Sequence, residues 1–170
     1  MPLRFDWLGF DQAERVASVR NRCYGARESE LAHFLGLLLR DRRAGDGDFL
    51  VASDAGRDVG TATSLRLTMW VRGTAVPCQG VAWVGAVKSA RRRGGDEAGV
   101  ASQVMRQMLA AARDRGEVLS ALMPFRASFY EHFGYGLVER RFDWTVPLGI
   151  LTPSTFKSVR FYEDTDLNAV

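Results

Sequence analysis

Residues 84–102 read VGAVKSARRRGGDEAGVAS, and the expected organisation of the chain follows from this stretch. Its first residues continue an apolar run that begins near residue 79, and a basic, glycine-rich loop over 89–99 leads into a helical pattern that starts at Val100. The run is apolar on both faces, which predicts a buried central strand. Backbone N–H groups and the macrodipole at a helix start attract anions, and glycines let a backbone approach a diphosphate closely. The stretch therefore predicts a strand, an anion-binding loop and a helix, in that order.

Three consecutive arginines, Arg91, Arg92 and Arg93, stand in this loop. Arginine suits phosphate because its planar guanidinium can donate two parallel hydrogen bonds. The loop lacks the Lys-Ser/Thr pair of a nucleotide-hydrolysing P-loop, which favours binding of a diphosphate over its cleavage. The alternative interpretation is a solvated basic turn before a helix.

The regions on either side predict a mixed α/β sheet with helices on its faces. Strands over 79–88 and 118–123 flank a helix over 100–115, and this unit predicts a right-handed crossover between parallel strands. The other expected elements are strands over 3–8, 49–53 and 59–71, helices over 11–24 (with Asp11 as N-cap and Glu14 as its capping-box partner), 29–42 and 126–133, and a final hairpin of strands over 135–139 and 140–146. The expected order is β-α-α-β-β-β-α-β-α-β-β.

The composition is that of one globular domain. The chain has 170 residues, of which 46% are apolar and 25% charged, and no apolar run approaches the ~18 residues of a membrane span. Residues 1–10, MPLRFDWLGF, contain no continuous apolar stretch, so a secretory signal is not expected. The net charge of +3 is too balanced to indicate nucleic acid. We therefore expect a cytoplasmic protein that binds neither membranes nor nucleic acids.

The cysteines and histidines disfavour several classes of enzyme. Cys23, Cys78, His33 and His132 match no zinc spacing and no CxxC redox pair. No HExxH, GxSxG or GxxxxGK[ST] motif occurs. Metallohydrolases, serine hydrolases and Walker-type ATPases are therefore disfavoured, no bound metal is expected, and both thiols are predicted to be small core residues.

A second informative block, SFYEHFGYG, spans residues 128–136. Helical spacing pairs Phe129 with Phe133, which predicts core packing. Tyr130 and Tyr135 each carry a phenol that needs a hydrogen-bond partner when buried. Taken alone, either tyrosine is more often structural than catalytic.

Four segments together resemble the GNAT acyltransferase superfamily: VGAV from Val84, RRRG from Arg91, GVASQVM from Gly99 and FYEHFGYG from Phe129. Within it, residues 1–146 are most similar to the N-terminal domain of the enhanced-intracellular-survival type of N-acetyltransferase. The resemblance implies a GNAT-like acyl-CoA N-acyltransferase fold. It also implies acetyl-coenzyme A as the donor and a primary amine, on a small molecule or a protein lysine, as the acceptor. Residues 147–170 are expected to be a linker or the start of a further domain.

The resemblance assigns roles by position. Backbone groups of Val84, Ala86 and Val87 are implied to contact the pantetheine arm, and Tyr130 is implied to be the general acid. The residues implied to hold the pyrophosphate are Arg92, Arg93, Gly94, Gly95, Gly99 and Val100. In the expected reaction the amine attacks the thioester carbonyl directly, and a backbone N–H near Val87 stabilises the oxyanion. The phenol, protonated at neutral pH, donates its proton to the departing sulfur.

Two features depart from the family pattern. An apparent insertion, Gly95–Ala98, separates the arginines from Gly99, and Ser89 stands where a proline is usual. Asp96 and Glu97 in the insertion would repel a diphosphate unless they point outward or bind the acceptor amine. The alternative function is therefore a non-catalytic GNAT-like module for interaction or acyl-CoA sensing, with its loop disabled by these two acids.

The acceptor side is the least constrained by the sequence. Glu28 and Glu30, between the first two expected helices, could attract a cationic amine, but the helix dipole equally explains acids at a helix start. Relatives of this type place their C-terminal carboxylate in the active site as the base, and no matching segment is expected in this sequence. The general base, the acceptor and the oligomeric state, with a homo-oligomer as one option, stay open.

Overall fold

The computed structural model describes residues 2–24, 27–90, 99–139 and 142–147. It divides into two units, Met1–Gly136 and Leu137–Val170, and every helix and strand assigned to the described residues lies in the first. The domain boundary expected at residue 146 stays a prediction. Within the described ranges, no helix is long and apolar enough to cross a membrane.

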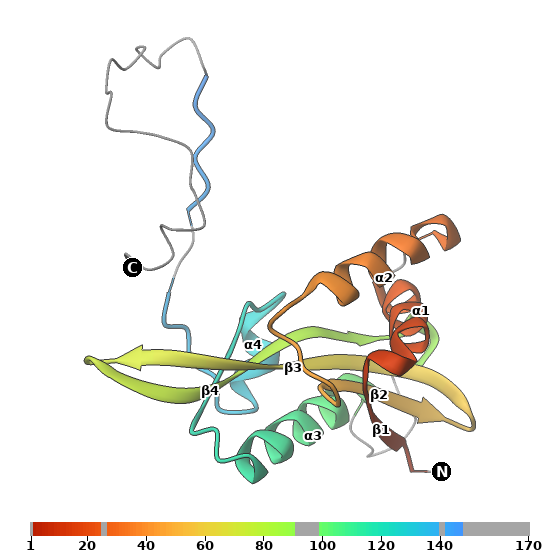
Figure 1. Ribbon diagram of the computed structural model, residues 1–170, viewed down its shortest axis with the longest axis horizontal. Helices are drawn as coiled ribbons and strands as arrows, with labels where there is room; N and C mark the ends of the chain where they lie inside the picture. The colour runs from red at the N-terminus through yellow and green to blue at the C-terminus, as the bar shows by residue number, and fades with distance from the viewer. Residues whose placement is uncertain (1, 25–26, 91–98, 140–141, 148–170) are drawn as a thin grey trace. The chain divides into compact units, whose positions relative to one another are not determined.

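The described part of the first unit contains five strands and four α-helices (Figure 1). The strands are β1 (Arg4–Leu8), β2 (Phe49–Asp54), β3 (Arg57–Val71), β4 (Thr74–Ala86) and β5 (Leu119–Leu122). The α-helices are α1 (Ala13–Tyr24), α2 (Leu31–Arg40), α3 (Val100–Asp114) and α4 (Ala127–Glu131). Short 3-10 helices lie between them: η1 (Phe10–Gln12), η2 (Glu28–Glu30) and η3 (Lys88–Ala90).

The five strands form one mixed sheet in the order β1-β2-β3-β4-β5. The first four strands pair antiparallel, whereas β4 pairs with β5 in parallel. Helix α3 connects β4 to β5, because two parallel strands cannot be joined by a hairpin. This arrangement confirms the parallel strand–helix–strand unit expected from the sequence. It also places β4 between two partners, as apolar residues on both of its faces indicate.

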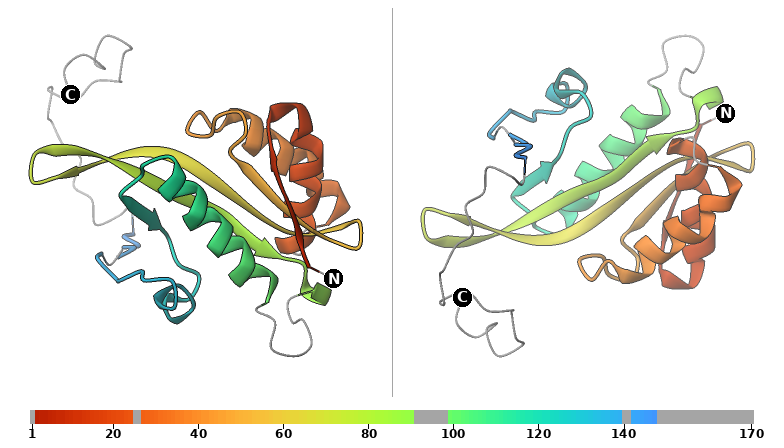
Figure 2. Two further views of the ribbon diagram at one scale, coloured as in Figure 1. Left: turned by 90° about the horizontal axis from the view of Figure 1, so that it is seen from below. Right: turned by 90° about the horizontal axis from the view of Figure 1, so that it is seen from above.

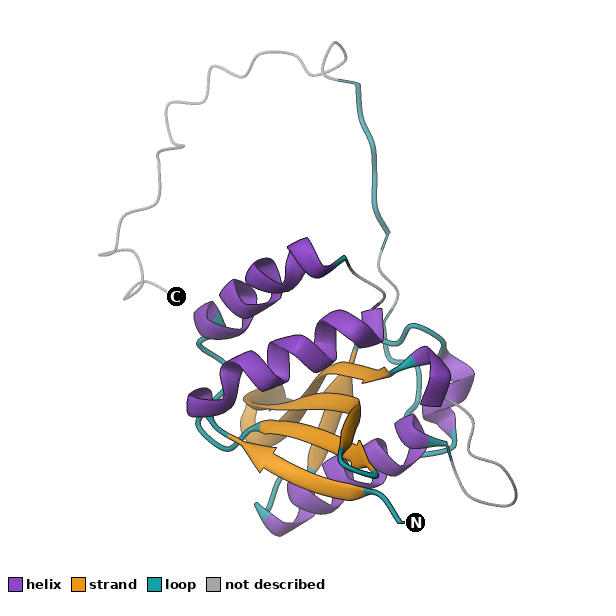
Figure 3. Cartoon of the chain, turned by 90° about the vertical axis from the view of Figure 1, so that its right-hand side faces the viewer, coloured by secondary structure: helices purple, strands orange, loops and turns teal. Residues whose placement is uncertain are grey.

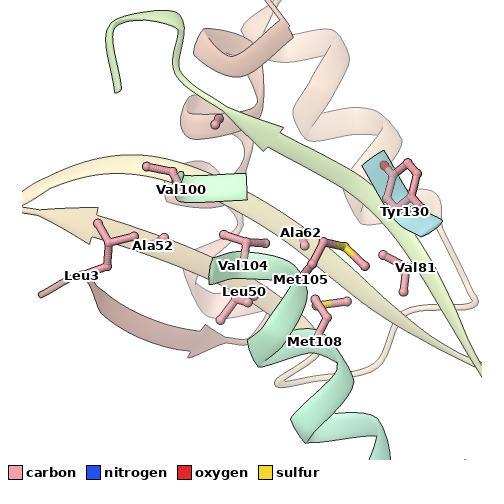
Figure 4. Close-up of a cluster of buried hydrophobic side chains, with 11 residues drawn as sticks. Leu3, Leu50, Ala52, Ala62, Val81, Val100, Val104, Met105, Met108 and Tyr130 are labelled. Atoms are coloured by element: carbon pink, nitrogen blue, oxygen red, sulfur yellow. The ribbon is translucent and has the colours of Figure 1, made fainter. Parts of the chain in front are cut away.

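Helices α1 and α2 cover one face of the sheet, and α3 covers the other (Figures 2 and 3). Leu50 and Ala52 of β2 pack with α3. Phe49 and Val51 alternate with them along the strand and pack with α1 and α2. Met105 of α3 is fully buried in the cluster that contains Leu50 and Ala52 (Figure 4). The core therefore consists of two layers, one on each side of the sheet.

Strand β4 starts at Thr74, earlier than the expected residue 79, and forms a long hairpin with β3. The turn residues Arg72 and Gly73 have φ of 49° and 81°, the left-handed values of a type I′ turn. Pro77 disfavours a strand because it lacks an N–H group. The strand tolerates it because β5 pairs with β4 only from Cys78 onward. The hairpin end reaches past the helices (Figure 2).

The final hairpin expected over residues 135–146 is wrong. The described residues after α4 contain no strand. Apolar side chains there are open to solvent, with Val138 97% exposed and Trp144 86% exposed. An alternating pattern identifies an apolar face, but a strand also needs a neighbouring strand for its backbone hydrogen bonds.

The start of the first helix also differs from the expectation that Asp11 caps it. The chain enters α1 through η1, whose N-cap is Gly9. Oδ1 of Asp46 accepts a hydrogen bond of 3.0 Å from the backbone N–H of Phe10. The capping carboxylate therefore comes from the loop after α2, a partner that local sequence cannot show.

Candidate active site

Strands β4 and β5 lie side by side over only part of their lengths. Their parallel pairing runs from Cys78 opposite Leu119 to Val81 opposite Leu122. β5 ends there, while β4 continues to Ala86. Among the described residues no strand follows this edge of β4 beyond Val81, so an extended ligand can pair with its backbone.

A β-bulge lies in this part of β4. Thr61 of β3 pairs with Gly85. Two residues later Thr63 pairs with Ala82, so β4 has one residue more than β3 between the two pairs. Trp83 within the bulge has φ of 56°, a left-handed conformation that bulky residues rarely adopt. The bulge changes the direction of β4 where it leaves β5.

An aromatic cluster from α1, α2 and β4 packs at the bulge. The rings of Tyr24 and Phe34 lie edge-on to the ring of Trp83, with centroids 5.7 and 6.0 Å away. The Tyr24 hydroxyl donates a hydrogen bond of 3.1 Å to the carbonyl oxygen of Val84. Tyr24 is 49% exposed, and partial burial raises its pKa to about 12, so the hydroxyl keeps its proton at neutral pH.

A buried arginine lies beneath the same bulge. Arg20 of α1 is 1% exposed, and its Nη2 donates a hydrogen bond to Oγ1 of Thr63. Its guanidinium carbon lies 4.9 Å from the ring centroid of Trp83. Its Nε has no hydrogen-bond partner among the described residues. Burial lowers the pKa of Arg20 to about 10, so the side chain stays charged at neutral pH.

Helix α3 begins next to the end of β4. Its first residue, Val100, packs in the same cluster as Ala86. Gly99 is the N-cap, and its carbonyl accepts the N–H of Gln103 at 3.1 Å. The N–H groups of the residues between them have no acceptor within the helix and suit an anion. The other residues expected around a pyrophosphate lie outside the described part of the chain: Arg92, Arg93, Gly94 and Gly95.

An open hollow of about 360 Å³ lies between α3 and α4. Its lining residues are Ser102, Arg106, Arg126, Ser128, Phe129, His132 and Phe133. Arg106 lies in the second turn of α3, and Arg126 directly precedes α4. Two guanidinium groups in one hollow can bind phosphate. In the ranges that the structure describes, no group of three or more His, Cys, Asp or Glu side chains could hold a metal ion.

Tyr130 lies on α4 and is 4% exposed. It belongs to the cluster on the α3 side of the sheet, together with Val81 and Met105 (Figure 4). Its ring lies edge-on to that of Tyr135, with centroids 6.0 Å apart. Burial, and after it the neighbouring Tyr135, raises the pKa of Tyr130, so the phenol is a proton donor at neutral pH.

The second tyrosine of this block has a partner of its own. The hydroxyl of Tyr135 lies 2.5 Å from Oγ of Ser120 on β5. The Ser120 hydroxyl donates to Oε1 of the buried Gln79 at 3.0 Å. Nε2 of Gln79 in turn donates to Oγ of Ser64 at 2.9 Å and to the carbonyl of Met108 at 2.8 Å. This chain of hydrogen bonds ties three strands and α3 together.

The residues predicted to contact the pantetheine arm and those predicted to attract the acceptor amine lie on different elements. Val84 and Ala86 lie on β4, and Val87 follows directly, with its N–H donating to the carbonyl of Val59 at 2.8 Å. That N–H is therefore engaged in strand pairing. Oε2 of Glu30 accepts the backbone N–H of Arg27 at 3.1 Å, a local capping contact. Glu28 also lies in η2.

Arg20, Tyr24 and the bulge at Trp83 were not predicted from the sequence. One signal could have pointed to Arg20: helical spacing places it with Val16 and Cys23 on the apolar face of the first helix, where a charged residue is unusual. The bulge leaves no signal, because the residues around Trp83 are apolar in either register.

Comparison with known proteins identifies the family. Residues 8–138 match the model of the acetyltransferase (GNAT) domain. The chain belongs to the GNAT acetyltransferase family. Over 99 residues this GNAT domain is 34% identical to an uncharacterized N-acetyltransferase of Streptomyces avermitilis, a match that covers 57% of this chain and 22% of that protein.

Solved structures share the fold of this GNAT domain. A GCN5-related N-acetyltransferase from Kribbella flavida is 30% identical, with a TM-score of 0.57 over 78% of this chain and 32% of that chain. Eis1 from Mycobacterium abscessus is 24% identical, with a TM-score of 0.62 over 79% of this chain and 31% of that chain. The chain thus spans about a third of these two proteins and about a fifth of the Streptomyces relative. The matches confirm the mixed α/β GNAT fold expected from the sequence.

Proposed function

We propose that this GNAT domain transfers an acetyl group from acetyl-coenzyme A to a primary amine, on a small molecule or a protein lysine. The observation that carries the proposal is the edge of β4 beyond Val81, its last residue paired with β5, which continues toward the start of α3. A strand edge offers hydrogen bonds to the amides of a pantetheine arm, and a helix start offers N–H groups to a diphosphate. Coenzyme A carries both groups, joined in that order.

The donor would lie along β4 with its diphosphate at α3. Backbone groups of Val84 and Ala86 would contact the pantetheine arm, as the family resemblance implies. Val87, the third residue implied, already uses both of its backbone groups: its N–H donates to Val59, and its carbonyl accepts from Ala90 at 2.9 Å. The pyrophosphate would lie at the start of α3, held by Gly99, Val100 and the loop residues Arg92, Arg93, Gly94 and Gly95. Arg106 and Arg126 in the neighbouring hollow would add positive charge for the third phosphate. A structural neighbour, described as a predicted acetyltransferase from Clostridium acetobutylicum and solved with acetyl-CoA, has a TM-score of 0.59 over 85% of this chain and 96% of that chain at 12% identity.

The chemistry would proceed without a covalent enzyme intermediate. The amine nitrogen forms a bond to the thioester carbon, and the electron pair of the carbonyl moves onto its oxygen. Because the N–H of Val87 already donates to Val59, an N–H of the bulge around Trp83 would stabilise this oxyanion. The tetrahedral intermediate then collapses, its C–S bond breaks, and Tyr130 donates its proton to the departing sulfur. The proton that the amine loses returns the tyrosine to its neutral form.

The test measures binding and turnover separately. Binding of acetyl-coenzyme A is followed as a rise in melting temperature, and turnover as release of the coenzyme A thiol with a panel of polyamines, aminoglycosides and lysine peptides. The proposal predicts both signals. Arg126→Met should raise the Kd of coenzyme A about fivefold, because it removes one guanidinium from the hollow. The matched control is Arg22→Met, at an exposed position on α1, which should leave the Kd unchanged.

The two outcomes against the proposal are distinct. No melting shift at millimolar acetyl-coenzyme A would contradict the assignment of the donor. A shift without turnover on any amine would favour the alternative function, a module that senses acyl-coenzyme A.

A further inference from the structure

We propose that Arg20 and Tyr24 of α1 are positioning residues that hold the β4 bulge in its reactive shape, an inference that rests on the acetyl transfer proposed above. The two residues are four apart, about one helical turn, so they reach the sheet at neighbouring points. Tyr24 donates to the carbonyl of Val84 in the bulge. Arg20 contacts both strands that form the bulge, at Thr63 of β3 and Trp83 of β4.

The conformation of Trp83 requires such support. A non-glycine residue in the left-handed region persists only where the surrounding structure holds it. The face of the Trp83 ring is occupied by the Arg20 guanidinium, whose carbon is 4.9 Å from the ring centroid. Tyr24 and Phe34 contact it edge-on. Three of its neighbours therefore come from the first two helices, and two of them from α1.

The chemistry of Arg20 argues against a role as simple core filling. Burying a guanidinium removes its hydration, and its Nε finds no partner among the described residues. An aliphatic side chain would fill the same space without that cost, as replacements of buried ions by apolar residues show. What an aliphatic chain would lack is the hydrogen bond to Thr63 together with the cation on the Trp83 ring. Those two contacts join β3 to β4 across the extra residue.

The consequence for catalysis is a separation of rate from affinity. The bulge contributes the N–H that would stabilise the oxyanion, and such donors must be held in position before the reaction. The diphosphate of coenzyme A would be held elsewhere, at the start of α3. Loosening the bulge should therefore slow the chemical step and leave coenzyme A binding nearly intact.

The experiment compares Tyr24→Phe and Arg20→Met with Arg22→Met, an exposed position on the same helix. We expect kcat to fall about tenfold in each of the first two variants, while the Kd of coenzyme A changes less than about twofold. Amide hydrogen exchange of residues 82–86 should accelerate in both variants, because local opening of the bulge becomes easier. Arg22→Met should match the parent chain in all three measurements. Arg20→Lys keeps the charge without the planar fork and should not restore kcat.

The outcomes are separable from those of the proposed function. Tyr24→Phe removes one hydroxyl and keeps the ring, so it tests the inference even if Arg20→Met does not fold. Exchange of residues 82–86 and kcat both equal to the parent values in Tyr24→Phe would overturn the inference. A parent chain that transfers no acetyl group would refute the proposed function. Hydrogen exchange needs no substrate, so it would still test whether Arg20 and Tyr24 stabilise the bulge.

Discussion

Gly60 of β3 lies directly against Val100, the first residue of α3. A Cβ at position 60 would stand 2.7 Å from Cγ1 of Val100 and 3.3 Å from Cγ2 of Val104. The absence of a side chain at Gly60 therefore sets how closely the start of α3 approaches the sheet.

Gly60→Ala should push the start of α3 away from β3. We expect the free energy of unfolding to fall by about 1–3 kcal/mol, the usual effect of overpacking. Coenzyme A should also bind more weakly, because the N–H groups that face its diphosphate move with the helix. Urea denaturation and a coenzyme A titration measure the two effects. Gly136→Ala is the matched control, since nothing lies within 4 Å of a Cβ there; an equal loss of stability in both variants would contradict the prediction.

Tyr130→Phe should impair the reaction and spare donor binding. Removing a general acid lowers turnover by about 100-fold or more, whereas the Kd of acetyl-coenzyme A should stay within about twofold of the parent value. Single-turnover acetyl transfer and the ligand-induced melting shift measure the two quantities. Tyr135→Phe removes the neighbouring half-buried phenol and its contact with Ser120. The Tyr135→Phe variant should lose stability more than turnover. A turnover of Tyr130→Phe equal to that of the parent chain would exclude Tyr130 as the acid.

Alkaline pH should destabilise the domain through three phenols that differ in exposure: Tyr130 is buried, Tyr135 is half-buried and Tyr24 is 49% exposed. Burial raises the pKa of Tyr24 to about 12 and also raises the pKa of Tyr130 and Tyr135. Because a phenol in the unfolded chain titrates near pH ~10, the unfolded state loses these protons first, and the free energy of unfolding falls as the pH rises from about 10 toward 12. In Tyr24→Phe the fall should be shallower. Urea denaturation between about pH 8 and 11 checks this, and parallel curves for the two chains would contradict it.

Gln79→Leu should destabilise the domain strongly. The buried amide of Gln79 joins Ser64, Ser120 and the carbonyl of Met108, and a leucine would remove all three of these hydrogen bonds from the core. We expect a loss of about 2–4 kcal/mol in the free energy of unfolding, measured by urea denaturation. Gln12→Leu, at an exposed position, should change it by less than about 0.5 kcal/mol. A loss equally small for Gln79→Leu would show that the network is dispensable.

Local patterns in the sequence predicted most of the elements. Helical spacing of Val104 and Met108 indicated α3, and apolar residues on both faces around Val81 indicated a strand inside the sheet. The last predicted hairpin failed because pairing depends on a neighbouring strand that no local pattern contains. The start of β4 was misplaced because Pro77 carries a local signal against a strand, and only the sheet shows that Pro77 precedes the first residue of β4 that pairs with β5.

The amino-acid sequence by itself determined the order of elements as far as α4, the parallel strand–helix–strand unit and the glycine at the start of α3, because each depends on residues close together in the chain. The tertiary structure alone decided the bulge at Trp83 and the two α1 side chains beneath it. A one-residue slip between strands changes no local pattern when both faces are apolar. The contacts of Tyr24 with Val84 and of Arg20 with Thr63 join residues 60 and 43 positions apart, so they exist only once α1 lies on the sheet.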